Sequence, residues 1–131
     1  YYKKNKVIEF FEQPLPADQI EELFELSKDF PIAIDESFQK FPSKFNKWNS
    51  FIIRRPSLEG DPISLLDEIR RNDAKNIITT TFETGIGLRW IHHMAALQEQ
   101  NNPSLKPGLA INWFPNNNLF SREPETVWRS I

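Results

Sequence analysis

The sequence predicts an α/β fold with a parallel sheet, because short apolar segments alternate with helix-like segments along the 131 residues. Five of the apolar segments have the length and the β-branched or aromatic residues typical of strands. They are mostly apolar instead of alternating, as expected for strands that are covered on both faces. Strands and helices in strict alternation, joined by short loops, imply parallel strands with right-handed crossovers.

Five parallel strands fit either an open doubly wound sheet or an arc of a (β/α)₈ barrel. No glycine-rich fingerprint follows the first predicted strand, and the sequence has no phosphate-binding loop motif. This disfavours a nucleotide-binding doubly wound sheet. A closed barrel typically needs about 250 residues, so this chain would supply a little over half of one. We therefore expect a partial TIM-type barrel of five parallel strands with intervening helices.

The first part of the chain contains two predicted strands, at residues 7–11 (VIEFF) and 31–34 (PIAI). Asp18 is placed to cap the helix between them. Residues 38–48 carry aromatic side chains at helical spacing, but Pro42 interrupts the run. Because proline breaks a helix interior, we expect a short or broken helix there.

The second part begins with a predicted strand at residues 51–53. Asp61 followed by Pro62 is a typical helix start, with a capping side chain and proline at the first helical position. Residues 76–82 are rich in β-branched residues and predict the fourth strand, and residues 109–114 predict the fifth. The helix between these two strands is expected to begin at Gly85 and to bury Trp90, Ile91, Met94 and Ala95.

The composition argues against several classes of protein. The formal net charge is −2 and the charges are spread along the chain, which argues against nucleic acid or an anionic membrane as the main partner. No apolar run approaches the roughly 20 residues that span a bilayer. These residues include no cysteine, which excludes thiolate metal sites and cysteine nucleophiles among them and is compatible with the cytosol. We therefore expect a cytoplasmic protein.

Two acidic residues close neighbouring predicted strands, Glu12 after the first and Asp35 after the second. Because the carboxyl ends of parallel strands open onto the same face of the fold, we expect these two carboxylates to lie close together. Such oxygen ligands suit a hard divalent cation such as Mg²⁺. By alternation their neighbours Glu9 and Glu36 should point away. The alternative is that each acid caps the next helix or forms a surface ion pair, and spacing alone does not separate the two interpretations.

Polar residues also mark the ends of the third and fourth predicted strands. Arg54 and Arg55 are adjacent, so alternation directs one side chain into the mouth of the fold and the other away from it. Thr79, Thr81 and Glu83 recur at a period of two and would share one face of the fourth strand. Hydroxyl groups there can bind a substrate carboxylate, although threonine is also simply a good strand former.

Several segments resemble the enolase superfamily. Residues 10–15 (FFEQPL) and 32–37 (IAIDES) are similar to barrel strands four and five of its muconate-lactonizing branch. Residues 77–88 (IITTTFETGIGL) resemble strand seven and the following helix of the o-succinylbenzoate synthases, and residues 107–109 (PGL) resemble their entry to strand eight. The first two motifs point to the superfamily, and the third narrows the resemblance to the synthases.

The resemblance implies strands four to eight of a (β/α)₇β barrel, with a capping domain and the first barrel strands upstream of this chain. It implies one Mg²⁺ bound by Glu12, Asp35 and a third acid on strand three, where it would stabilise the enediolate formed when a strand-two lysine removes an α-proton. The small-molecule substrate would be 2-succinyl-6-hydroxy-2,4-cyclohexadiene-1-carboxylate, dehydrated to o-succinylbenzoate in menaquinone or phylloquinone biosynthesis. Thr79, Thr81 and Gly108 match the positions that hold the succinyl carboxylate.

One position departs from the family, because the strand-six lysine that precedes a proline in relatives is Arg55 here. A guanidinium would still stabilise an enolate, but it hardly deprotonates and is a poor base. Arg55 therefore suits a one-base dehydration and argues against a dipeptide epimerase or N-acylamino-acid racemase, which remain alternatives within the superfamily. A non-catalytic binding or assembly module built on the same barrel is a further alternative.

The resemblance also predicts how the 131 residues behave by themselves. The strand-two lysine and the strand-three acid are not among them, so we expect the isolated polypeptide to be inactive. An arc of a barrel has two open strand edges and an uncovered apolar interior, both of which promote association. We therefore expect a homo-oligomer.

Overall fold

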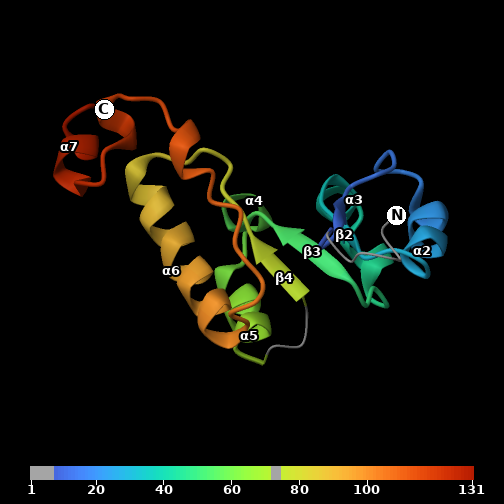
Figure 1. Ribbon diagram of the computed structural model, residues 1–131. Coiled ribbons are helices and arrows are strands. Elements are labelled where there is room, and N and C mark those ends of the chain that lie inside the picture. Colours follow the sequence, from blue (N-terminus) through green and yellow to red (C-terminus); the bar gives the residue numbers. More distant parts are fainter. Residues whose placement is uncertain (1–7, 72–74) are drawn as a thin grey trace. The chain divides into compact units, whose positions relative to one another are not determined.

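The computed structural model describes residues 8–71 and 75–131 and shows a mixed α/β chain (Figure 1). Its strands are neighbours in the order in which they occur along the sequence, β1-β2-β3-β4, in one parallel sheet. These strands are β1 (Phe11–Glu12), β2 (Ile32–Ile34), β3 (Phe51–Arg54) and β4 (Lys75–Ile78). The predicted α/β class with parallel strands is confirmed.

Helices follow each strand, as the alternating pattern predicted. The α-helices are α2 (Ile20–Ser27), α3 (Glu36–Lys40), α4 (Pro56–Glu59), α5 (Pro62–Arg71), α6 (Gly85–Asn101) and α7 (Pro124–Trp128). The 3₁₀ helices are η1 (Pro42–Phe45), η2 (Ile111–Trp113) and η3 (Asn118–Phe120). Within the described residues, none of the helices has both the length and the apolar character that a membrane crossing requires.

The chain divides into two compact units, residues 1–53 and residues 54–131. The core of the first unit is rich in aromatic rings. Phe24 stacks on Phe45 with ring centroids 5.7 Å apart, and Trp48 meets both rings edge-on. Large rings each bury much apolar area, so this small unit forms a core from few side chains. Its buried members are Leu23, Ile32, Ile34, Phe45 and Ile52.

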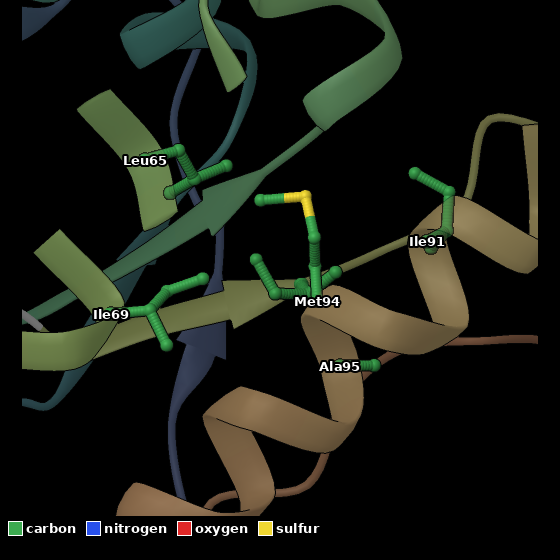
Figure 2. Packing of buried hydrophobic residues seen from close by; sticks show 6 residues of the cluster. Leu65, Ile69, Ile91, Met94 and Ala95 are labelled. Carbon is green, nitrogen blue, oxygen red and sulfur yellow. The ribbon is translucent and has the colours of Figure 1, made fainter. Parts of the chain in front are cut away.

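The core of the second unit lies where α5 and β4 pack against α6. Figure 2 shows Leu65 and Ile69 of α5 with Ile91, Met94 and Ala95 of α6. The three α6 residues have the spacing that places side chains on one face of a helix. Ile78 of β4 completes this cluster and is 0% exposed. The prediction that α6 begins at Gly85 and buries Ile91, Met94 and Ala95 is confirmed.

The prediction of a fifth strand at residues 109–114 is wrong. In this part of the described chain, Gly108 alone pairs with the end of β4, through a parallel bridge to Thr79. Ala110 then has a φ of 46°, which takes the backbone into the left-handed region and out of the extended conformation. The chain continues as η2, so extended pairing ends after one residue. The described sheet has four strands, and a closed or partial barrel is not established by it.

Two predictions near the start of the chain also need correction. The strand expected at residues 7–11 is only Phe11–Glu12 within the described residues, and Val7 lies outside them. Gln13 has a φ of 36°, which ends the extended backbone just after Glu12. Asp18 does not cap the following helix, because α2 begins at Ile20 and Gln19 occupies the N-cap position. Sequence periodicity located this helix but not its first residue.

In α6, Trp90 is 39% exposed, contrary to the prediction that it belongs to the buried face. Ile91 is the better-placed neighbour, because it is in register with Met94 and Ala95 on the face that meets α5 and β4. From the sequence alone, Trp90 and Ile91 are adjacent apolar residues, and either could face the core. The C-terminal segment contains η3 and α7.

Two local predictions are confirmed. Ile63 N–H donates to Asp61 Oδ1 at 3.0 Å and the Ser64 hydroxyl donates to Asp61 Oδ2 at 2.6 Å, so Asp61 caps α5 at its proline-led start. These hydrogen bonds, from Ser64 first, lower the pKa of Asp61. The interruption at Pro42 separates α3 from η1, as the broken-helix prediction required.

Candidate functional site

Glu12 and Asp35 lie at the carboxyl ends of paired parallel strands. Glu12 of β1 is the register partner of Ala33 in β2, and Asp35 lies two residues beyond Ala33. Because side chains alternate along a strand, this register assigns the side chains of Glu12 and Asp35 to the same face of the sheet. Their backbones are offset by about 7 Å along the strand direction. The expectation that the two carboxylates lie close together stays a prediction, and the register is compatible with it.

The two acids differ strongly in exposure. Glu12 is exposed, whereas the Asp35 side chain is only 1% exposed. Asp35 also occupies the N-cap position of α3, but its side chain makes no capping hydrogen bond there. Their neighbours Glu9 and Glu36 are both exposed. The alternative interpretation, in which the Asp35 side chain caps the next helix, is therefore wrong.

Gln13 fixes the backbone around Asp35, and the sequence did not identify it. Its side-chain Oε1 accepts hydrogen bonds from the backbone N–H groups of Asp35 at 2.9 Å and of Ser37 at 3.2 Å. Its Nε2 donates to the Ser37 hydroxyl at 2.7 Å and to the carbonyl of Leu15 at 2.8 Å. One amide side chain therefore fastens the end of β1 to the end of β2.

The donor set at this edge is compatible with a hard cation. Two carboxylates on one sheet face, at neighbouring strand ends, are the kind of oxygen ligands that Mg²⁺ uses together with water. Among the described residues no group of three or more histidine, aspartate or glutamate side chains comes together as a complete metal site. Glu12 and Asp35 would therefore hold an ion only weakly by themselves.

The side chain of Arg54 lies in a buried polar cluster of the second unit. Its Nε donates to both Glu59 carboxylate oxygens, at 3.0 and 2.8 Å, and its Nη1 donates to Glu68 at 2.5 Å and to Asn76 Oδ1 at 3.1 Å. Burial lowers the pKa of Arg54, but the hydrogen bonds and negative charges of Glu59 and Glu68 outweigh it and raise the pKa. The arginine links β3 to α4, α5 and β4.

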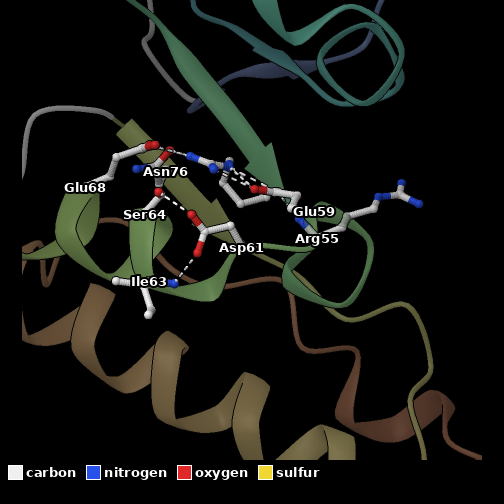
Figure 3. A network of polar contacts seen from close by, with 8 residues as sticks. Arg55, Glu59, Asp61, Ile63, Ser64, Glu68 and Asn76 are labelled. Carbon is white, nitrogen blue, oxygen red and sulfur yellow. Dashed lines mark hydrogen bonds and ion pairs between the residues drawn. The ribbon is translucent and has the colours of Figure 1, made fainter.

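Arg55 extends in another direction. Figure 3 shows its side chain directed away from the cluster of Glu59, Glu68 and Asn76. Its backbone joins them, through the N–H that donates to Glu59 Oε1 at 2.8 Å. The two arginines therefore point apart, as alternation predicted, and Arg54 is the structural one. Arg55 belongs to the second unit, whereas Glu12 and Asp35 belong to the first.

Thr79 and Gly108, which lie far apart in the sequence, are brought together. The Thr79 hydroxyl donates to the Gly108 carbonyl at 2.8 Å, and Gly108 N–H donates to the Ile78 carbonyl at 2.8 Å. A Cβ on residue 108 would lie 3.0 Å from the Thr79 hydroxyl oxygen. Glycine at 108 thus permits the close approach. The hydroxyl predicted to bind a substrate carboxylate is engaged by protein backbone in this structure.

Thr81 contacts a carboxylate, and that carboxylate belongs to Glu83. The Thr81 hydroxyl donates to Glu83 Oε1 at 2.7 Å, and its backbone N–H lies 3.0 and 3.1 Å from the two carboxylate oxygens. The hydroxyls of Ser57 and Thr80 add hydrogen bonds of 2.6 Å each. Burial raises the pKa of Glu83, but hydrogen bonds from Ser57, Thr80 and Thr81 outweigh it and lower the pKa from 4.5 to about 2.

The position of Glu83 differs from the one that the sequence predicted. It was expected to share a strand face with Thr79 and Thr81, but β4 ends at Ile78 and Phe82 has a φ of 61°. The left-handed turn brings Glu83 back over the threonines. A signal was present in the sequence, since hydroxyl residues followed closely by an acid often form local side-chain hydrogen bonds.

An apolar pocket of about 240 Å³ lies in the first unit. It is lined by Phe11, Pro14, Leu26, Phe30 and Ile32. Its lining offers no charged or hydroxyl group to recognise a carboxylate, so it does not match the predicted substrate.

Comparisons of the chain with models of known protein families, with curated proteins and with solved structures find no match. The class of protein that the fold defines is a mixed α/β chain with a four-stranded parallel sheet. Polar groups gather at the carboxyl ends of its strands, at Glu12 and Asp35 in one unit and around Glu83 in the other. Ligand sites of parallel α/β folds generally lie at that edge.

Proposed function

We propose that the chain is part of a Mg²⁺-dependent o-succinylbenzoate synthase of the enolase superfamily, built from strands four to eight of its barrel. The observation that carries the proposal is the register of β1 and β2, which assigns Glu12 and Asp35 to one face at neighbouring strand ends. The sequential order of the four strands supports it, because successive strands of a (β/α) barrel are neighbours.

In this proposal Glu12 and Asp35 supply two of the three acids that hold the ion, which would provide positive charge beside the substrate carboxylate. Gln13 is a positioning residue, because it fixes the backbone N–H of Asp35. Arg55 would stabilise negative charge that develops on the substrate without acting as a base. Thr79, Thr81 and Gly108 would lie near the succinyl carboxylate.

A second function is favoured by one observation. Thr79 and Thr81, which match the substrate-carboxylate positions, already donate their hydroxyls to Gly108 and Glu83. A protein that keeps the scaffold but engages these groups internally would serve as a non-catalytic binding or assembly module. Arg55 argues against a two-base epimerase or racemase of the same superfamily.

The test is formation of o-succinylbenzoate by two polypeptides. We expect none from residues 1–131 alone, and Mg²⁺-dependent product from a longer polypeptide that also supplies the strand-two lysine and strand-three acid. In the longer form, Glu12→Gln or Asp35→Asn should abolish most of the activity, whereas Glu9→Gln and Glu36→Gln, exposed neighbours with matched chemistry, should not. Turnover by the short polypeptide would contradict the assignment of the base.

An inactive long polypeptide would leave Arg55 to be tested. If Arg55→Lys then restores turnover, the arginine is the cause of inactivity and the family assignment stands. If it does not, and the long polypeptide is folded, the non-catalytic module is the better proposal.

A further inference from the structure

The carboxylate of Glu83 is enclosed by hydroxyl groups from two parts of the second unit. Ser57 belongs to α4, whereas Thr80 and Thr81 follow β4. We propose that Ser57, Thr80 and Thr81 form a carboxylate-binding site, that Glu83 is its tethered occupant, and that a free carboxylate binds there when the Glu83 side chain is removed. The inference deepens the proposed function, on which its relevance to a substrate carboxylate rests.

The donors satisfy both oxygens of one carboxylate group. Oε1 accepts from the hydroxyls of Ser57 and Thr81 at 2.6 and 2.7 Å, and Oε2 accepts from the hydroxyl of Thr80 at 2.6 Å. The Thr81 N–H lies between the two oxygens, at 3.0 and 3.1 Å. An ionised carboxylate only accepts hydrogen bonds, and hydrogen bonds to a charged acceptor are stronger than neutral ones. The site therefore selects the ionised form.

The hydroxyl of Thr80 is held in position by the rest of the loop. Thr80 is 8% exposed, and its hydroxyl oxygen accepts the Phe82 N–H at 3.0 Å. With its oxygen engaged by the backbone, the hydroxyl proton is directed to the carboxylate. The turn itself therefore orients the Thr80 hydroxyl, independently of Glu83.

Gly87 makes room for the present occupant. A Cβ at residue 87 would lie 2.9 Å from Glu83 Cβ and 3.3 Å from Glu83 Cγ. Such contacts are too close, so the glycine allows the Glu83 side chain to lie across the first turn of α6. Truncating Glu83 empties space that begins at Gly87 and ends at the three hydroxyls.

The tether explains why the site would not take a free carboxylate in the native chain. Because Glu83 lies on the same short loop, its carboxylate has an effective concentration in the millimolar range or above at the site. A weakly binding carboxylate in solution does not compete with it. Glu83 is thus an internal competitor. Thr81 is one of the positions that the family resemblance assigns to the succinyl carboxylate, so displacement of Glu83 would have to accompany substrate binding.

The experiment measures the stability of Glu83→Ala in the 131-residue chain as acetate replaces chloride at constant ionic strength and neutral pH. We expect a saturable increase, with the folded-to-unfolded ratio rising about elevenfold at ten times the dissociation constant. The native chain and Glu83→Gln, which fills the same space, should show no dependence. Glu99→Ala removes a surface carboxylate that pairs with Lys106 and is the matched control.

A second variant separates this site from general salt effects. Ser57→Ala combined with Glu83→Ala removes one donor and should weaken acetate binding at least several-fold, seen as a shift in the acetate midpoint of the Thr81 amide resonance. If Glu83→Ala is unfolded without acetate, recovery of its helical signal by acetate but not chloride supports the proposal. Equal responses to acetate and chloride, or an unchanged midpoint in the double variant, would overturn it. None of these readouts depends on o-succinylbenzoate formation, so they fail independently of the proposed function.

Discussion

The side chain of Gln98 in α6 holds the backbone of Ile78 in β4. Ile78 N–H donates to Gln98 Oε1 at 2.7 Å, and Gln98 Nε2 donates to the carbonyl of Leu105 at 2.9 Å. Gln98 is 4% exposed, so a helix residue here replaces hydrogen bonds that water would otherwise make. The single amide connects the strand, the helix and the segment that returns toward Gly108.

Replacing Gln98 with leucine should destabilise the chain by about 1–3 kcal/mol, because the Ile78 N–H and Leu105 carbonyl lose their partner while remaining buried. Urea denaturation followed by circular dichroism measures the difference. Gln100→Leu, the same change at an exposed position of α6, is the control and should cost less than about 0.5 kcal/mol. Equal effects of the two substitutions would contradict the role of the buried amide.

Glu83 predicts an acid-sensitive contribution to stability. Its pKa is lowered from 4.5 to about 2 in the folded chain, so its contribution is complete above pH 4.5 and is lost as the pH falls toward 2. The carboxylate is partly exposed, and screening by solvent reduces the effect to about 1–2 kcal/mol. Denaturant midpoints across this pH range measure it. Glu83→Gln should flatten the curve by that amount, whereas Glu99→Gln should leave its shape unchanged.

Arg54 predicts a much larger cost than an exposed arginine. Arg54→Ala removes the partner of Glu59, Glu68 and Asn76 and leaves the largely buried Glu59 carboxylate without its counter-charge, so we expect a loss of about 3–5 kcal/mol. Arg70→Ala, in an exposed pair with Asp67 at 3.7 Å, should cost less than about 1 kcal/mol. Thermal unfolding compares them. A small effect of Arg54→Ala would show that the cluster adapts by taking in water.

Gly85 predicts strain between α6 and the C-terminal segment. A Cβ on residue 85 would lie 1.8 Å from the Ser121 carbonyl oxygen and 3.2 Å from Val127 Cγ2, so Gly85→Ala must displace the segment carrying η3 and α7. We expect a loss of about 1–3 kcal/mol, with faster amide exchange at Val127 than at Met94. Ile86→Ala, at an exposed position of the same turn, is the control. Unchanged exchange at Val127 would refute this contact.

Self-association is predicted from the exposed apolar side chains and the ends of the sheet. Trp113 and Trp128 are 78% and 71% exposed, and β1 has its described strand partner on one side only. Such features favour association. Light scattering should show a mass above that of one 15.4 kDa chain, increasing with concentration. A Trp113→Ser and Trp128→Ser variant should associate less, and a monomer at all concentrations would contradict the prediction.

Features set by neighbouring residues were predictable from the sequence. Asp61 and Pro62 start α5 through contacts within a few residues, and Pro42 breaks a helix by its own geometry. Alternation predicted parallel strands, and the lack of a glycine-rich fingerprint favoured the sequential strand order of a barrel arc over a doubly wound sheet. The register that assigns Glu12 and Asp35 to one face depends on the pairing of β1 with β2, and the closeness of their carboxylates stays a prediction.

Features set by backbone reversals were not predictable. Ala110 and Phe82 both have positive φ values, which alanine and phenylalanine rarely adopt, so neither residue type predicts them. The first reversal ended the expected fifth strand, and the second turned Glu83 onto Thr80 and Thr81. Trp90 was misplaced because adjacent apolar residues on a helix compete for one buried face, and packing against α5 decides which is buried.

The pairing of Gly108 with Thr79 has a mechanical consequence. Gly108 N–H donates to the Ile78 carbonyl, and the Gly108 carbonyl accepts the Thr80 N–H. No described neighbour of Gly108 continues this pairing. Hydrogen bonds at a single residue fix the position of Gly108 beside Thr79. They do not fix the direction of the backbone after Gly108. That direction is set by the left-handed turn at Ala110. A change at Ala110 would therefore act on the contacts that η3 and α7 make with α6, and not on the pairing of β1 to β4.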